Sequence, residues 1–326
     1  MLTKRDLLKA SAAMGGLAFG LGTGGEASAQ MVDQLQLFVP AAPGGGWDQT
    51  ARTMEQVLKT EKLINTVQIT NVPGAGGAVG LPQFVNQWKG RQNALMVGGL
   101  VMVGALIANK APVKITQTVP IARLTGEFEV LVVPADSPLK TAKDFAAAMK
   151  ADPKKTSVAG GSAGGTDHIM LGMIGRALGV PAKDISYVAY AGGGPALAAI
   201  LGGHVAAGIS GFGEFGEQIK AGKLRALAIS AGTRQPEIDV PTLKEQGIDV
   251  ELFNWRGVFA PPGTAGAQRD ALIALVEKMA GSASWKDQLK KRDWTPILLT
   301  GDAFATYIQE ENDRITAILK DLGLAS

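Results

Sequence analysis

The feature that most constrains the fold of this sequence is a recurring unit: a strand-like segment, a glycine-rich turn and a helical pattern. Gln34–Val39 alternates as a strand does, and Pro40–Gly46 ends it. Apolar residues then recur at helical spacing from Ala51 onwards. Strands that alternate with helices in this way predict an α/β fold with largely parallel sheets.

These units fall into two groups, one near residues 34–100 and one near residues 156–230. Two extended apolar segments, Thr125–Pro134 and Asn254–Pro261, stand where the chain would cross between the groups. We therefore expect two α/β lobes, each a mixed sheet flanked by helices, joined by a hinge of two crossover segments. The C-terminal helices should return to the first lobe. The expected borders are 30–130 with 255–326 for lobe 1 and 131–254 for lobe 2.

Composition excludes several kinds of chemistry. Of 326 residues 43 are glycine, none is cysteine and two are histidine. The chain therefore forms no disulfide, thiolate metal site or cysteine nucleophile, and a histidine-rich metal site is not expected. We expect no cofactor and no metal. The net charge is only +3, and no basic run is interleaved with aromatic residues, so nucleic-acid binding is not predicted.

The N-terminus has the pattern of an export signal. Residues 1–29 combine a basic start, a weakly apolar Ala/Gly run and a small-residue cleavage pattern that ends at Ala29. The start is similar to a twin-arginine signal with Lys4 in place of the first arginine, so both Tat and Sec export stay open. An ordinary amphipathic helix is the alternative. The expected mature chain is periplasmic, cleaved near Ala29, without a membrane-spanning run.

The glycine-rich turns predict a site for an anion. In open α/β sheets, ligands bind beyond the carboxyl ends of the strands, where helix N-termini offer free N–H groups and a positive dipole end. Glycine allows the backbone to approach a ligand closely because it has no Cβ. Four such turns, two in each lobe, could surround one small anion from both sides.

Several side chains near these turns have two interpretations each. Trp47 could pack on ligand carbons or cover the core, and Asp48 could cap its helix or contact the ligand. Thr166 could donate a hydrogen bond to the ligand or cap its helix. Arg256 lies in an apolar crossover and needs a partner, which a ligand carboxylate or an internal acid would provide. Ser162 and Tyr190 could donate hydroxyl hydrogen bonds.

A serine hydrolase is the competing enzyme hypothesis. Gly160–Gly164 matches G-x-S-x-G and lies between a predicted strand and helix. The distal histidine would have to be His204, with Asp184 before it, and no HGGG-type signature accompanies them. The dinucleotide and P-loop fingerprints are also absent from the sequence. We therefore expect a binding protein and not an enzyme.

The chain resembles the extracytoplasmic solute receptors of tripartite tricarboxylate transporters, the Bug or TctC family. The order and spacing of the matching segments extend over nearly the whole mature chain. The segments that carry the resemblance are Ala42–Arg52, Asn71–Gly80, Gly160–His168, Tyr190–Gly193, Ile219–Ala228 and Trp255–Thr264.

The resemblance implies a periplasmic binding protein of the type II, Venus-flytrap kind, whose lobes close on a carboxylate. Backbone amides and ordered water of the first two loops would hold the ligand, and the other two loops would face them. Many members carry tyrosine or phenylalanine in place of Arg256, so a third anionic group, as in citrate or a similar tricarboxylate, is expected here. The implied ligand-binding residues are Gly45, Gly46, Trp47, Asp48, Ala75, Gly76, Gly77, Ser162, Gly164, Gly165, Thr166, Tyr190, Ala191, Gly192, Gly193 and Arg256.

The implied partners are the membrane subunits of a tripartite tricarboxylate transporter, and we expect the receptor to be a monomer. A ligand-binding sensor that feeds a signalling kinase is the alternative, and it differs only in its partner.

Overall fold

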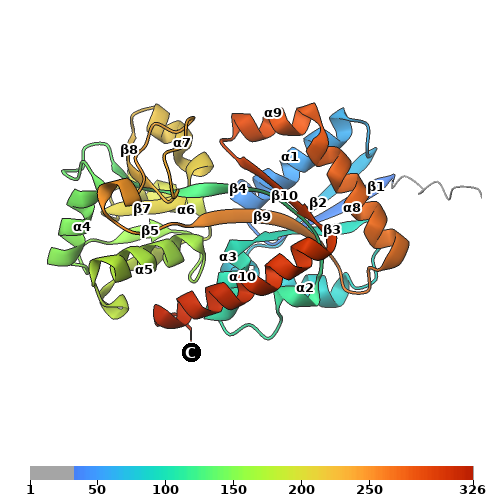
Figure 1. The fold of residues 1–326 in the computed structure, drawn as a ribbon, viewed down its shortest axis with the longest axis horizontal. Helices are drawn as coiled ribbons and strands as arrows, with labels where there is room; N and C mark the ends of the chain where they lie inside the picture. Colours follow the sequence, from blue (N-terminus) through green and yellow to red (C-terminus); the bar gives the residue numbers. More distant parts are fainter. Residues whose placement is uncertain (1–32, 326) are drawn as a thin grey trace, which may run out of the picture. The chain divides into compact units, whose positions relative to one another are not determined.

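Two long strands, β4 (Val119–Pro134) and β9 (Phe253–Ala260), run through the middle of the fold and join its two halves (Figure 1). The structure is a computed structural model that describes residues 33–325. Within these residues ten strands form one sheet, in the order β2-β1-β3-β9-β4-β7-β5-β6, with β8 and β10 also paired to β4. The predicted export signal and its cleavage site lie outside the described residues.

One half of the sheet contains β1, which pairs with β2 and β3 in parallel. The first part of β4 joins this half through antiparallel pairing with β9 and β10. The other strands of this half are β1 (Gln34–Val39), β2 (Thr66–Asn71), β3 (Ala94–Gly99) and β10 (Thr295–Thr300).

The other half is built around the last part of β4, which pairs antiparallel with β7 and β8. Here β5 pairs in parallel with β6 and β7. The strands of this half are β5 (Val158–Gly160), β6 (Tyr187–Ala189), β7 (Ala207–Gly211) and β8 (Leu224–Ile229).

The α/β class with mixed sheets is confirmed, but the expectation of largely parallel pairing is wrong around the two crossovers. All pairs that include β4 or β9 are antiparallel. Connectivity accounts for the β4–β9 pair: β4 carries the chain out of one half and β9 brings it back, so the two run in opposite directions. Strand–helix–strand units give parallel pairs only in the outer parts of the sheet.

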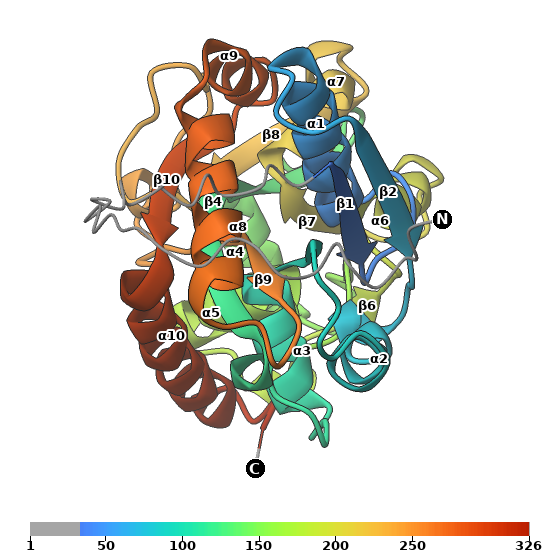
Figure 2. The ribbon, with the colours of Figure 1, turned by 90° about the vertical axis from the view of Figure 1, so that its right-hand side faces the viewer.

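Helices cover the sheet, and the C-terminal elements lie with the half that begins the chain (Figure 2). There α9 packs on α1, and α10 packs on α3 and β4. The helices are α1 (Gly46–Thr60), α2 (Gly80–Gln87), α3 (Leu100–Ala108), α4 (Ala142–Ala151), α5 (Thr166–Leu178), α6 (Gly193–Leu201), α7 (Phe212–Lys220), α8 (Gly266–Gly281), α9 (Ala283–Lys291) and α10 (Gly301–Asp321). Across residues 33–325 none of them is both long and apolar enough to span a bilayer.

Successive side chains of β4 point to opposite faces of the sheet and pack into two different hydrophobic cores. Leu131 and Val133 enter the larger core, whereas Val130 and Val132 enter the smaller one on the opposite face of the sheet. Because all four side chains are fully buried, the crossover strand is held firmly on both faces.

Candidate ligand-binding site

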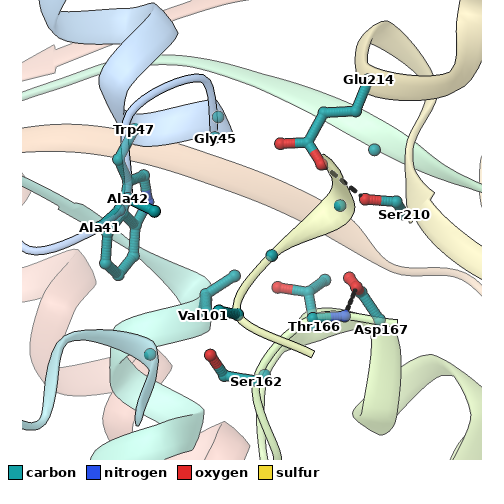
Figure 3. A pocket seen from close by; sticks show the side chains of 18 of the residues that line it. Ala41, Ala42, Gly45, Trp47, Val101, Ser162, Thr166, Asp167, Ser210 and Glu214 are labelled. Atoms are coloured by element: carbon teal, nitrogen blue, oxygen red, sulfur yellow. Dashed lines mark hydrogen bonds between the residues drawn. The ribbon is translucent and has the colours of Figure 1, made fainter. Parts of the chain in front are cut away.

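One cavity lies where the first turns of several helices from both halves of the sheet meet (Figure 3). Its walls come from the turns before α1, α5, α6 and α7 and from the crossover strand β9. The lining residues are Pro40, Ala41, Ala42, Gly45, Gly46, Trp47, Gly74, Ala75, Gly76, Val101, Gly161, Ser162, Gly165, Thr166, Asp167, Ala191, Gly192, Gly193, Ser210, Gly211, Glu214, Asn254 and Arg256.

The turn before α1 is held in place by Asp48. This carboxylate accepts hydrogen bonds from the Gly44 N–H at 2.8 Å, from Arg52 Nε at 2.8 Å and from Asn71 Nδ2 at 2.9 Å. Burial alone would raise the pKa of Asp48, but these hydrogen bonds outweigh it and lower the pKa. Asp48 therefore supports the loop from behind and does not line the cavity, which agrees with the capping interpretation.

The second loop ends in a short 3-10 turn, Ala75–Gly77, that requires glycine for two reasons. Gly76 has φ +60°, and a Cβ there would lie 2.6 Å from the Ala105 Cβ on α3. Absence of a side chain thus allows the turn to lie against α3 with its backbone facing the cavity.

On the opposite wall, the turn before α5 is braced by Tyr187 and His168. The Tyr187 hydroxyl donates to the Gly161 carbonyl at 2.8 Å, and its ring stacks on His168 with centroids 4.2 Å apart. His168 Nδ1 accepts from the Gly164 N–H at 3.1 Å, and burial lowers the pKa of His168 to about 4. This histidine is therefore a neutral acceptor that shapes the loop.

The first turns of α1 and α6 present backbone amides to the cavity. The first intrahelical bonds run from the Gln49 N–H to the Gly45 carbonyl and from the Ala196 N–H to the Gly192 carbonyl. The amides before them have no intrahelical acceptor. On α5, the Thr166 hydroxyl is fully buried, lines the cavity and has no hydrogen-bond partner among the described residues.

Arg256 has an internal partner. Its guanidinium pairs with the carboxylate of Glu127 and lies over the Trp294 ring, 4.9 Å from the centroid. Glu127 is fully buried and also accepts from the Gly213 N–H at 2.9 Å. Of the two interpretations of Arg256, the structure gives it an internal acid, and contact with a ligand stays a prediction.

Two further acids lie beside this pair. Asn254 Nδ2 donates to Glu129 Oε1 at 2.8 Å, and the Gly161 N–H donates to Asp167 Oδ2. Burial and the neighbouring charge of Asp167 raise the pKa of Glu129 well above its usual range. Burial also raises the pKa of Asp167.

The structure brings most of the predicted residues together around this cavity. Those that line it are Gly45, Gly46, Trp47, Ala75, Gly76, Ser162, Gly165, Thr166, Ala191, Gly192, Gly193 and Arg256. The predicted residues that do not line it are Asp48, Gly77, Gly164 and Tyr190. Their part in ligand binding stays a prediction, since no ligand is present.

Sequence reasoning missed four polar residues of the lining: Ser210, Glu214, Asp167 and Asn254. A signal for Glu214 existed, because Gly211–Gly213 is a further glycine turn between a strand and a helix. Asp167 directly follows Thr166 at the end of the predicted glycine-rich loop, with no site role predicted for it. Asn254 lies in the predicted crossover segment, two residues before Arg256.

The architecture defines a class: two α/β halves joined by crossover strands around a cavity of helix N-termini form a periplasmic binding protein fold. A solved structure described as "Structure of a periplasmic transporter" is 28% identical, with a TM-score of 0.81 over 90% of this chain and 98% of that one. A profile of the family described as "Tripartite tricarboxylate transporter family receptor" matches residues 50–324. The chain belongs to this family, which confirms the resemblance seen in the sequence.

Individual relatives agree with this assignment. The protein BugT of Bordetella pertussis is 27% identical over 294 residues, covering 89% of each chain. MatC of Rhodopseudomonas palustris, solved with bound malate, is 27% identical with a TM-score of 0.76 over 88% of this chain and 98% of that one. The family consists of receptors and not of enzymes, so the serine-hydrolase alternative is set aside.

Proposed function

We propose that this protein is a periplasmic receptor that captures a small carboxylate between two lobes and delivers it to a tripartite tricarboxylate membrane transporter. The observation that carries the proposal is the convergence of the first turns of α1, α5 and α6 on one cavity. Free backbone amides and the positive ends of helix dipoles favour a carboxylate at this point. The bound malate of MatC supports the same class of ligand.

The proposed motion is closure of lobe 1, residues 30–130 with 255–326, on lobe 2, residues 131–254. Contacts from both walls to one carboxylate ligand would favour the closed state over the open one. Citrate is the ligand that the sequence favours, because Arg256 could pair with a third carboxylate. The Glu127 partner of Arg256 weakens this argument, and malate is the stronger first probe.

Calorimetry on residues 30–326 tests the proposal with citrate, malate, glutamate and terephthalate. We expect saturable heat with at least one of them.

A pair of neighbouring glycines provides a variant and its control. A Cβ at Gly193 would meet the Ser210 hydroxyl and the Glu214 carboxylate, whereas a Cβ at Gly194 would meet nothing within 4 Å. Gly193→Ala should therefore change the affinity and Gly194→Ala should not. Absence of heat and of any thermal shift with every carboxylate would refute the receptor function.

The transporter partner needs a separate test. Loaded receptor should bind membrane vesicles that contain the transporter subunits, and the ligand-free receptor should bind them more weakly. Retention on a membrane sensor kinase instead of the transporter would favour the sensor alternative.

A further inference from the structure

The Glu214 carboxylate lines the cavity and faces the helix N-termini that meet there. It projects from the first turn of α7 toward Gly45, the residue before α1 (Figure 3). A Cβ at Gly193 would overlap Glu214 Oε2, and a Cβ at Gly46 would lie 2.9 Å from Glu214 Oε1. Ser210 Oγ donates to the carboxylate at 2.7 Å, and the Gly46 N–H also donates to it. A side chain of the protein thus uses donors that a ligand carboxylate would need.

The surroundings of Glu214 leave it without a cation of its own. Asp167 on α5 and Glu129 on β4 face it as further acids, and their charges interact with it. Arg256 on β9 lies nearby but is paired with Glu127 on β4. Of the other elements that pack against α7, β7 and α6 carry no charged residue, and the Arg225 guanidinium on β8 donates to the carbonyls of Ala135, Ser137 and Leu139.

We propose that Glu214 is a specificity-determining residue that takes up a proton when an anionic ligand enters, so that carboxylate capture is linked to proton binding. This inference rests on the proposed function. Two carboxylates that share a small buried site cannot both stay ionised, and one of them holds a proton. The protonated carboxyl can then donate a hydrogen bond to the ligand carboxylate.

Burial raises the pKa of Glu214 to about 7 in the ligand-free protein, which places the linkage in the neutral range. A ligand anion raises this pKa further, so binding takes up protons and affinity must fall as the pH rises. Glu214 should also lower the affinity for ligands with several carboxylates, because a further carboxylate near Glu214 would face another acid instead of a free backbone amide.

Malate titrations between pH 6 and 8.5 test this, since malate stays doubly ionised over the range. The wild-type Kd should rise by up to about tenfold per pH unit above pH 7. Calorimetry in two buffers of different ionisation enthalpy should show net proton uptake with malate near pH 7. Glu214→Gln should remove both effects, and Glu217→Gln, at an exposed position of the same helix, should retain both.

The outcomes separate the two ideas. If malate binds but wild type and Glu214→Gln show the same pH dependence and the same proton uptake, this inference is overturned and the receptor function stands. If no carboxylate binds to any variant at any pH, both are overturned. The pKa of Glu214 can also be measured without a ligand, by NMR of the carboxyl groups of the free protein. Glu214 should titrate near pH 7. Titration near its ordinary value would contradict the inference.

Discussion

At the scale of single residues, Arg256 and Glu127 form a buried ion pair that should depend on both partners. Arg256 is 3% exposed and Glu127 is 0% exposed. Removing one partner leaves the other charge buried and uncompensated, so Arg256→Gln should lower the free energy of unfolding by about 3–5 kcal/mol. Urea unfolding of both single variants and of the double variant Glu127→Gln, Arg256→Gln measures the coupling.

The double variant should be more stable than the sum of the single changes predicts, because it leaves no unpaired charge. Additive losses would show that the pair is not coupled. The same three variants test whether Arg256 contacts the ligand. If it does, the double variant should bind the carboxylate more weakly than Glu127→Gln alone.

Asp48 gives a second prediction at this scale. Its lowered pKa means that its contribution to stability is complete above the unfolded value of 3.8 and is lost as the pH falls through the lower native value. Asp48→Asn should cost about 1–3 kcal/mol at neutral pH, because it weakens the hydrogen bonds that reach this buried carboxylate. In urea unfolding the difference from wild type should be constant from pH 5 to 8 and shrink below pH 3.8. Asp136→Asn, at an exposed site, serves as the control, and a difference that persists in acid would contradict the account.

At the scale of elements, α3 packs against the loop before α5 through bare backbone. A Cβ at Gly104 would overlap the Gly164 carbonyl oxygen, and a backbone atom cannot swing away as a long side chain can. Gly104→Ala should therefore push α3 away from this loop and weaken carboxylate binding about tenfold or more, although Gly104 does not line the cavity. Gly281→Ala, where a Cβ would meet nothing within 4 Å, should leave the affinity unchanged in calorimetry. Equal affinities for the two variants would show that this contact does not position the loop.

The same scale shows what the sequence could predict. Units such as β1 with α1 were predictable because their signals are local: alternation, a glycine turn and helical spacing within about 25 residues. The helix α3 was missed because Leu100–Ala108 is apolar on all sides, so it carries no helical periodicity. The contact of Glu214 with Gly46 could not be predicted from the sequence either. It joins residues far apart in the chain and exists only because β4 and β9 bring the two halves together.

At the scale of the whole molecule, two partly buried titratable groups, His168 and Glu214, should give the free energy of unfolding two opposing slopes with pH. Burial lowers the pKa of His168 from 6.5 to about 4, so its contribution is lost as the pH falls below 6.5. Burial raises the pKa of Glu214 from 4.5 to about 7, so its contribution is complete below pH 4.5 and is lost as the pH rises to about 7. Between pH 4.5 and 6.5 the two effects oppose each other.

Glu214→Gln removes one of these slopes from the ligand-free protein. The unfolding free energy of this variant relative to wild type should rise steadily from pH 4.5 to about 7 and then level off, because glutamine never has to lose a proton in the buried site. Urea unfolding at half-unit pH steps measures the difference, with Glu217→Gln as the exposed control on the same helix. A difference that is independent of pH would show that Glu214 titrates alike in the folded and unfolded chains. Its carboxylate would then be as well solvated in the cavity as in water, contrary to a site in which, among the described residues, Ser210 and the Gly46 N–H are its hydrogen-bond donors.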